Sequence, residues 1–129
     1  MRKVWINGCF DVLHRGHIEL FKFAKENGDY LIVGIDSDSR VKQLKGDSRP
    51  INNQKDRKFF LESIRYVDEV TIFESENQLI EKIAILKPDL MIVGSDYRNK
   101  RVIGSEKANK LMFFDRVGDY STTKILEKK

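Results

Sequence analysis

Five short apolar runs recur along the chain, and longer stretches with helical spacing separate most of them. The clearest run, YLIVGI at residues 30–35, is almost wholly apolar, which is typical of a strand buried on both faces. The first run ends at Asn7 and Gly8, which are turn-forming residues. We therefore predict strands at residues 4–6, 30–35, 70–73, 90–93 and 111–114.

Apolar residues with helical spacing fill the segments between these runs. Ile18, Phe21 and Ala24 share one face of a predicted helix at residues 17–27, and Gly28 follows as a helix-ending glycine. The other expected elements are a helix beginning at residue 53 or 54, a helix around residues 79–84 that KPD at 87–89 stops, and a loop at residues 45–53.

This alternation predicts the fold class. Strands that alternate with helices of roughly ten residues imply right-handed crossovers between parallel strands. With 129 residues and 40% hydrophobic content, the chain is long enough for one core but too short for two. We therefore predict a single α/β domain over residues 1–129, with a Rossmann-like, doubly wound, parallel five-stranded sheet.

The balance of charges restricts the class of partner. The chain carries 24 Lys and Arg against 20 Asp and Glu, and its net charge of +4 favours anionic partners. Because the positive residues are interspersed with acidic ones and form no basic block, we do not expect a nucleic-acid partner.

The chain's cysteine content and its N-terminal sequence indicate the expected compartment. The single cysteine, Cys9, excludes an internal disulfide and a thiolate-rich zinc site. The N-terminal apolar run is interrupted by Asn7, Gly8 and Asp11, which argues against a signal sequence, and no run is long enough to span a bilayer. We expect a cytoplasmic protein without a membrane partner.

Three strand-end segments carry most of the polar chemistry. GCFDVLHRGH at residues 8–17 follows the first strand, GSDY at 94–97 follows the fourth, and RVGDYSTT at 116–123 follows the fifth. In doubly wound sheets, ligands bind beyond the carboxyl ends of the strands, where the strand order reverses. We therefore expect the three segments to meet over one pocket.

The first segment has the features of a phosphate-binding turn. Gly8 and Gly16 lack Cβ atoms, so the main chain can approach a phosphate, and Gly16 lies just before a helix whose N-terminal amides attract anions. His14 and His17, the two histidines of the chain, can point the same way and donate hydrogen bonds to charge that builds on phosphate oxygens.

Cations and hydroxyls complete the expected site. In nucleotidyl transfer a phosphate nucleophile attacks an α-phosphorus and pyrophosphate departs, so the protein has to position groups and neutralise charge. Hydroxyls that cap a helix can also bind phosphate. The candidates are the cations Lys42, Lys45, Arg57 and Arg116, and the hydroxyls Ser121, Thr122 and Thr123.

Four separated motifs, in the right order, resemble the cytidylyltransferase-like branch of the HxGH nucleotidyltransferases. They are GCFDVLHRGH, SDSRVKQLKGDSRP, GSDY and YSTTKI, and the similarity spans almost the whole chain. Within that group, KGDSRPIN, its spacing to Asp56 and Arg57, and GSDY followed by IGSEK are similar to the adenylyltransferase domain of bacterial heptose 1-phosphate enzymes. Those enzymes make ADP-heptose from ATP.

The resemblance implies a fold, partners and residue roles. It implies the HxGH nucleotidyltransferase fold, Mg²⁺ bound with the triphosphate, and a homodimer to which residues 49–70 contribute. No dedicated carboxylate cage for the metal is visible in the sequence. The implied roles are catalysis for His14, His17 and Lys45, substrate binding for Lys42 and Arg57, and nucleotide binding for Cys9, Phe10, Asp11, Gly16, Asp96, Arg116, Ser121, Thr122 and Thr123.

Two substrate pairs stay open. Arg116 before GDYSTT and the run IRYVDEV at residues 64–70 are similar to glycerol-3-phosphate cytidylyltransferases, which have RTEGISTT at the first place and make CDP-glycerol from CTP. The motifs slightly favour ADP-heptose synthesis over CDP-glycerol synthesis. Heptose enzymes are often fused to a sugar kinase, so we expect any kinase step to lie outside this chain. The further alternatives are a non-catalytic nucleotide-binding regulator and a nucleic-acid-binding module.

Several candidates also have purely structural interpretations. Lys42 and Lys45 are interpretable as solvated charges, Arg57 as a member of an ion pair or a bridge between subunits, and Cys9 as a small residue in a tight turn. The aromatic residues read as core or interface, and not as a base-stacking surface: Trp5, Phe59, Phe60, Phe113 and Phe114.

Overall fold

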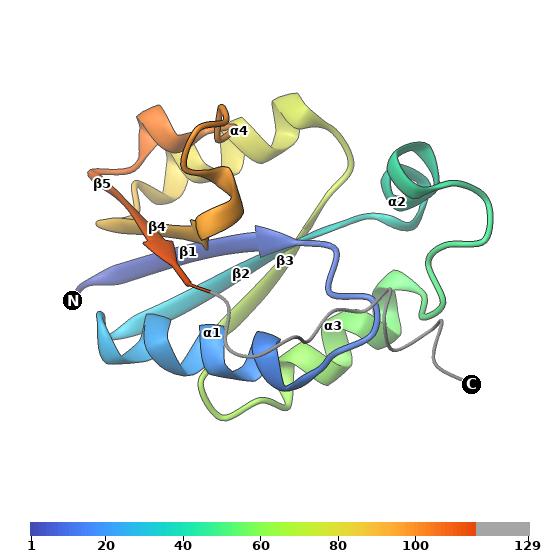
Figure 1. Cartoon of the computed structure of the whole chain (residues 1–129), viewed down its shortest axis with the longest axis horizontal. Helices are drawn as coiled ribbons and strands as arrows, with labels where there is room; N and C mark the ends of the chain where they lie inside the picture. The colour runs from blue at the N-terminus through green and yellow to red at the C-terminus, as the bar shows by residue number, and fades with distance from the viewer. Residues whose placement is uncertain (116–129) are drawn as a thin grey trace.

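The computed structural model describes residues 1–115 as alternating strands and helices (Figure 1). The strands are β1 (Lys3–Gly8), β2 (Tyr30–Asp36), β3 (Glu69–Phe73), β4 (Leu90–Gly94) and β5 (Lys110–Phe114). The helices are α1 (Arg15–Glu26), α2 (Asp38–Lys45), α3 (Gln54–Glu62) and α4 (Glu76–Leu86), with the 3₁₀ turns η1 (Ser95–Tyr97) and η2 (Ser105–Lys107) between β4 and β5.

All five strands are parallel and lie in the order β3-β2-β1-β4-β5. The chain builds outward from β1 to β3 on one side, and then returns to place β4 on the other side of β1. The strand order therefore reverses between β1 and β4, which is where ligands bind in open parallel sheets. The predicted α/β doubly wound sheet is confirmed.

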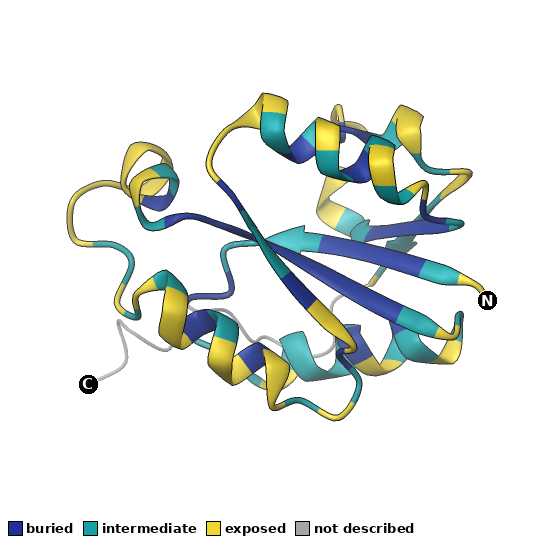
Figure 2. Cartoon of the chain, turned by 180° about the vertical axis from the view of Figure 1, so that it is seen from behind, coloured by how far each residue is buried: buried dark blue, intermediate teal, exposed yellow. Residues whose placement is uncertain are grey.

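Helices cover both faces of this sheet, as the predicted buried strands require. Figure 1 shows α1 and α3 on one face and α4 on the other, while α2 lies beyond the carboxyl end of β2. The period of two along each strand divides the apolar side chains between two cores. In β1, for example, Val4 and Ile6 belong to the core beneath α1, and Trp5 belongs to the core beneath α4. Figure 2 shows the buried strands between the exposed outer sides of the helices.

Trp5 is fully buried, and a glycine on the neighbouring strand makes room for its indole ring. A Cβ atom on Gly34 would lie 2.5 Å from Trp5 Cζ2. The indole Nε1 donates a hydrogen bond of 2.8 Å to Asn7 Oδ1, so the polar end of the ring is satisfied at the end of β1. The expectation that Trp5 belongs to the core is confirmed.

The predicted elements agree with the structure to within two residues, except that the helix predicted around residues 79–84 begins three residues earlier and that one glycine has a different role. Gly28 follows the cap residue Asn27, where a helix-ending glycine is expected, but it does not have the positive φ of the left-handed conformation that such a glycine usually adopts. A Cβ atom on Gly28 would lie 2.4 Å from Val4 Cγ2, so close packing against β1 requires the glycine. Among residues 1–115, no helix is long and apolar enough to cross a membrane.

The contact between Gly34 and Trp5 predicts a stability effect. Gly34→Ala should lower the free energy of unfolding by roughly 1–3 kcal/mol, because the added methyl group forces the indole ring out of its place. Gly94→Ala is the matched control, since a Cβ atom there would have nothing within 4 Å. Urea unfolding, followed by the fluorescence of the one tryptophan, measures both variants. Equal stability of the two variants would contradict the prediction.

Candidate active site

A cavity of about 630 Å³ opens at the carboxyl ends of β1, β2 and β4. Its walls come from the turn after β1, from α2 and the loop that follows it, and from the crossover between β4 and β5. The structure therefore confirms that the strand-end segments after β1 and β4 share one pocket. The predicted residues that line it are Cys9, Phe10, Asp11, His17, Lys45 and Asp96.

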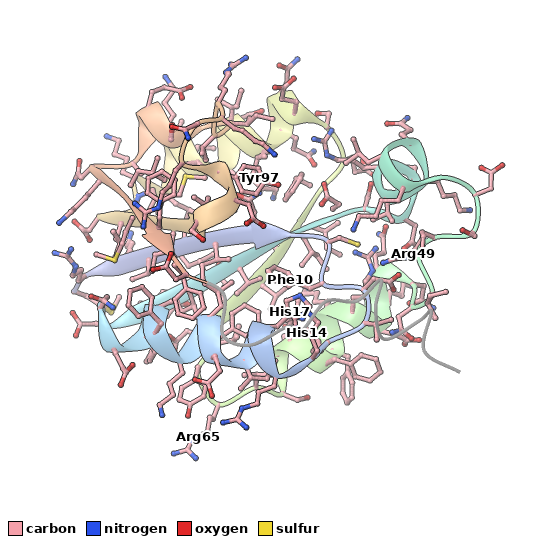
Figure 3. The ribbon with its side chains drawn as sticks, in the orientation of Figure 1. Phe10, His14, His17, Arg49, Arg65 and Tyr97 are labelled. Atoms are coloured by element: carbon pink, nitrogen blue, oxygen red, sulfur yellow. The ribbon has the colours of Figure 1, made fainter. Side chains whose placement is uncertain are left out.

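The two histidines cap helix α1 and fix each other's orientation. His14 is the N-cap residue, and its Nδ1 accepts a hydrogen bond of 3.0 Å from the main-chain N–H of Gly16. In return, the main-chain N–H of His14 donates to Nδ1 of His17 at 3.2 Å. The two rings stack with their centroids 3.8 Å apart, so His14 lies directly against the histidine that lines the cavity (Figure 3).

These hydrogen bonds assign the protonation of both rings. A nitrogen that accepts a hydrogen bond from a main-chain amide carries no proton, so each neutral imidazole must carry its proton on Nε2. Nε2 lies across the ring from the nitrogen that caps the helix. Both histidines are therefore hydrogen-bond donors through Nε2, as the stabilisation of charge on phosphate oxygens requires.

His17 is held in the neutral form. Burial lowers its pKa to about 4, and the neighbouring His14 and Lys45 contribute in the same direction. The edge of the Phe10 ring packs against the His17 ring with the centroids 5.3 Å apart. At neutral pH His17 therefore acts as an uncharged donor.

Phe10 occupies a backbone conformation that few side chains adopt. Its φ of 49° lies in the left-handed region, which costs about 1–3 kcal/mol for a residue other than glycine. In this conformation the ring is buried against His17 and Phe21. A Cβ atom on Gly8 would lie 3.2 Å from this ring, so the glycine permits the turn. The strained residue thus packs the His17 imidazole in place.

Asp11 binds the loop that follows α2. Its carboxylate accepts hydrogen bonds of 2.8 Å each from Arg49 Nε and from the main-chain N–H groups of Ile51 and Asn52. Burial alone would raise the pKa of Asp11, but these hydrogen bonds outweigh it, so the pKa lies below its ordinary value. The carboxylate holds two segments of the cavity wall together, and its predicted contact with nucleotide stays a prediction.

The predicted contact of Arg57 with substrate is wrong. The Arg57 side chain is 0% exposed. It donates to the main-chain oxygens of Cys9, Asp36 and Asn52 and pairs with Asp38 at 2.8 Å. A guanidinium held in this way cannot reach a ligand in the cavity. The ion-pair interpretation of this residue is the one confirmed.

Three other predicted residues lie off the cavity wall, namely His14, Gly16 and Lys42. The N–H of Gly16 is taken by the His14 ring, so this amide does not point at a ligand. Lys42 is exposed on α2 and does not line the cavity. Lys45, at the end of the same helix, does line it, and its charge helps to lower the pKa of His17.

Three arginines that the sequence analysis missed also line the cavity. They are Arg40, Arg49 and Arg101. Arg40, in α2, pairs at 2.7 Å with Asp36, the last residue of β2, so no spacing within a single helix could have revealed this pair. Arg101 comes from the crossover between β4 and β5, a region in which the motifs had pointed to Asp96 alone.

Cys9 is not an activated nucleophile. Burial raises the pKa of its thiol above the ordinary value, and this effect exceeds the opposing influence of Lys45 and Arg57. Its main-chain oxygen accepts a hydrogen bond of 3.0 Å from Arg57 Nη1. The residue therefore shapes the turn through its backbone, in line with its interpretation as a small residue in a tight turn.

The remaining candidates concern the C-terminal segment and the metal. Arg116, Ser121, Thr122 and Thr123 lie outside the described residues, and their roles stay predictions. Within residues 1–115, no three His, Cys, Asp or Glu side chains gather in an arrangement that could hold a metal ion. Asp96 lines the cavity from η1.

This chemistry suits a reaction in which the substrates supply both the nucleophile and the leaving group. The site offers the neutral imidazole of His17, with His14 stacked on it, and a lysine, and its one thiol is held protonated. Donors of this kind stabilise the charge that builds on a phosphoryl group during an in-line displacement. The fold is that of a nucleotidyltransferase. The chain belongs to the cytidylyltransferase-like family, whose model matches residues 5–128.

Named relatives support this family. The chain is 51% identical over 127 residues to the bifunctional protein HldE of Nitratiruptor sp., and 51% identical over 125 residues to that of Helicobacter pylori. These matches cover 98% and 97% of this chain, but the chain spans only 27% of the length of either relative.

Solved structures show the same fold. The lipopolysaccharide core biosynthesis protein from Thermoplasma volcanium has 26% sequence identity and a TM-score of 0.71, with 94% of this chain and 99% of that chain covered. Pantothenate synthetase from Thermus thermophilus has a TM-score of 0.62 at 13% identity, with 97% and 67% covered, and shows likeness of fold alone.

The lowered pKa of His17 predicts how stability depends on pH. Between pH 6.5 and about 4 the unfolded chain protonates this histidine while the folded protein does not, so the free energy of unfolding falls as the pH falls through that window. His17→Gln keeps an acceptor for the His14 N–H but does not titrate. It should therefore lose less stability than the wild type over this window, by on the order of 1–3 kcal/mol.

Urea unfolding at several pH values between 4 and 7 measures this difference. Parallel stability curves for the wild type and His17→Gln would show that His17 has an ordinary pKa in the folded protein.

Proposed function

We propose that this chain transfers a nucleotidyl group from a nucleoside triphosphate to a sugar phosphate and releases pyrophosphate, with ATP and heptose 1-phosphate as the leading substrate pair. The observation that carries the proposal is the histidine pair, whose Nδ1 atoms accept main-chain hydrogen bonds at the start of α1, so that the proton of each neutral ring lies on Nε2. The motif resemblance to heptose 1-phosphate adenylyltransferases and the 51% identity to HldE proteins support the substrate pair.

In the proposed reaction, an oxygen of the acceptor phosphate attacks the α-phosphorus in line. A new bond forms between them, the bond from the α-phosphorus to the bridging oxygen breaks, and that oxygen leaves with pyrophosphate. The Nε2–H groups of His14 and His17 donate to the phosphate oxygens as negative charge builds on them. Lys45, which lines the same cavity, neutralises charge on the triphosphate.

Magnesium fits this arrangement as a partner of the triphosphate. Mg²⁺ in such sites is held by phosphate oxygens and one or two carboxylates, and it neutralises phosphate charge. Asp96 lines the cavity from η1, within the GSDY motif that the resemblance places beside the nucleotide. We therefore propose that Asp96 faces the metal-bound triphosphate.

CTP with glycerol 3-phosphate is the second candidate substrate pair. One of the two sequence similarities that favour it lies away from the site. The run IRYVDEV, residues 64–70, leads into β3 at the amino end of the sheet. Figure 3 shows Arg65 far from His14 and His17. Likeness in this segment therefore carries no information about the base or the acceptor. The other support, Arg116, lies outside the described residues.

Pyrophosphate release tests the proposal. The wild-type chain should release pyrophosphate with ATP and heptose 1-phosphate in the presence of Mg²⁺, and much less when CTP or glycerol 3-phosphate replaces either substrate. Activity with CTP and glycerol 3-phosphate instead would establish the second candidate. No release with any of the four combinations would favour a nucleotide-binding regulator.

Variants of the helix cap provide the control for this assay. His14→Ala and His17→Ala should each lower kcat by about 100-fold or more, because each removes a donor that acts chiefly in the transition state. Arg15→Ala, at the exposed position between them, should keep turnover within about threefold. Circular dichroism checks that the variants fold. Full turnover in either folded histidine variant would exclude the proposed mechanism.

We further propose that the chain forms a homodimer through helix α3. Phe59 and Phe60 are 66% and 45% exposed on this helix, and exposed aromatic pairs mark interaction surfaces. Lys55, Phe59 and Glu62 follow one another at helical spacing, so they share a face. In an antiparallel pair about a two-fold axis near Phe59, Lys55 would lie opposite Glu62 of the partner subunit. The face is thus complementary to a second copy of itself.

Sedimentation of two variants tests the homodimer. Phe59→Glu should give a monomer, because it places two carboxylates beside the proposed axis. Ile85→Glu, at a 72% exposed position on α4, should leave the dimer intact. A monomeric wild type would refute the proposal, and so would a Phe59→Glu protein that stays dimeric.

A further inference from the structure

Arg57 joins four segments that build the cavity wall. One nitrogen, Nη1, donates to Cys9 O at 3.0 Å in the turn after β1 and to Asp36 O at 2.8 Å at the end of β2. Nε donates to Asn52 O at 3.0 Å in the loop before α3, and Nη2 donates to Asp38 at 2.8 Å in the first turn of α2. The turn that bears the histidines and the helix that bears Lys45 therefore meet at this one guanidinium.

Burying the charge of Arg57 costs free energy, so a contribution to stability does not explain its burial, whereas a role in positioning does. Arg57 is 0% exposed, while its ion-pair partner Asp38 has 35% of its side chain exposed. A buried ion pair contributes little net stability, because removing the charges from water offsets their attraction. What the planar fork of arginine does provide is fixed directions for several acceptors at once. Lysine has the same charge but presents its donors from a single nitrogen atom.

Asp11 also joins the turn after β1 to the loop after α2. Asn52 donates its main-chain N–H to the Asp11 carboxylate and its amide Nδ2 to Asp11 O at 2.7 Å, and its own carbonyl oxygen accepts from Arg57. Asn52 thus lies between a buried anion and a buried cation. The turn after β1 is tied to the loop after α2 at two successive places, Cys9 and Asp11.

We propose that Arg57 is a positioning residue, which holds the turn bearing His14 and His17 at a fixed distance from helix α2 and its Lys45. It acts through the main chain of Cys9 and through Asp38, without touching either substrate. The kinetic part of its test rests on the proposed function, whereas the spectroscopic part does not.

NMR titration of the two histidines supplies the spectroscopic test. The pKa of His17, about 4 in the closed turn, depends on burial and on the proximity of His14 and Lys45, and the direct charge of Arg57 is not among its causes. Because the chain has two histidines, their ring signals are simple to follow. In Arg57→Lys, which keeps the charge, the turn should open and the pKa of His17 should rise by at least one unit toward its ordinary value.

Three control variants separate positioning from general loss of stability. Leu61→Ala removes a fully buried side chain from the same helix, so it should destabilise the fold but leave the pKa of His17 unchanged. Arg65→Lys makes the same exchange at an exposed arginine away from the histidines and should have no effect (Figure 3). Asp38→Asn keeps an acceptor for Arg57 and should also leave this pKa unchanged.

Kinetics give the second readout once a substrate pair is found. Arg57→Lys should lower kcat at least tenfold and change the KM for the triphosphate less than threefold, because binding groups remain while their alignment is lost. If Arg57→Lys fails to fold, the pKa of His17 is measured in Asp38→Ala instead, because this variant breaks only the link between Arg57 and α2. An unchanged pKa of His17 in the folded variant would overturn the proposal whatever its turnover, and a raised pKa would support it even where no substrate pair reacts.

Discussion

The site depends on how the first turn of helix α1 satisfies its own backbone. A helix begins with amide groups that have no partner within the helix, and polar side chains usually cap them. Here two imidazole rings perform this task, and each uses Nδ1 to do so. The cap fixes both ring planes and both tautomers, so one of the groups that stabilise the helix, His17, also lines the cavity, and the other, His14, stacks on it. The same two hydrogen bonds therefore stabilise the start of α1 and fix the orientation of the imidazole rings.

A second set of interactions holds that turn against the other segments of the cavity wall. Phe10 packs on His17 from a left-handed backbone conformation, and the buried side chains of Asp11 and Arg57 secure the main chain on either side. A strained residue and two buried charges all destabilise the isolated turn. Phe10, Asp11 and Arg57 keep these positions because the contacts of each residue depend on backbone that the other two hold in place. Such mutual support is typical of a site that is preorganised before its substrates arrive.

The fold was predictable from the sequence because its signals are local. Continuous apolar runs predicted buried parallel strands, and the positions of His14 and His17 between a strand and a helix predicted that they share a site. The function of Arg57 was not predictable in this way. A motif shows that an arginine is present, but whether its guanidinium faces a ligand or the backbone depends on the packing of distant segments. The same limit applies to Arg101, which no motif distinguishes from the exposed arginines near it.

The geometry also shows which sequence similarities can inform the choice of substrate. In KGDSRPIN, residues Arg49, Ile51 and Asn52 bond to Asp11, so likeness there partly reflects the architecture of the loop. IRYVDEV lies at the opposite end of the sheet from the cavity. Among the segments that resemble the heptose enzymes, the end of α2, Arg49 and the crossover from GSDY to IGSEK all line the cavity. Because Asp96 and Arg101 of this crossover belong to the cavity wall, its resemblance to the heptose enzymes has the greater weight in the described part of the chain.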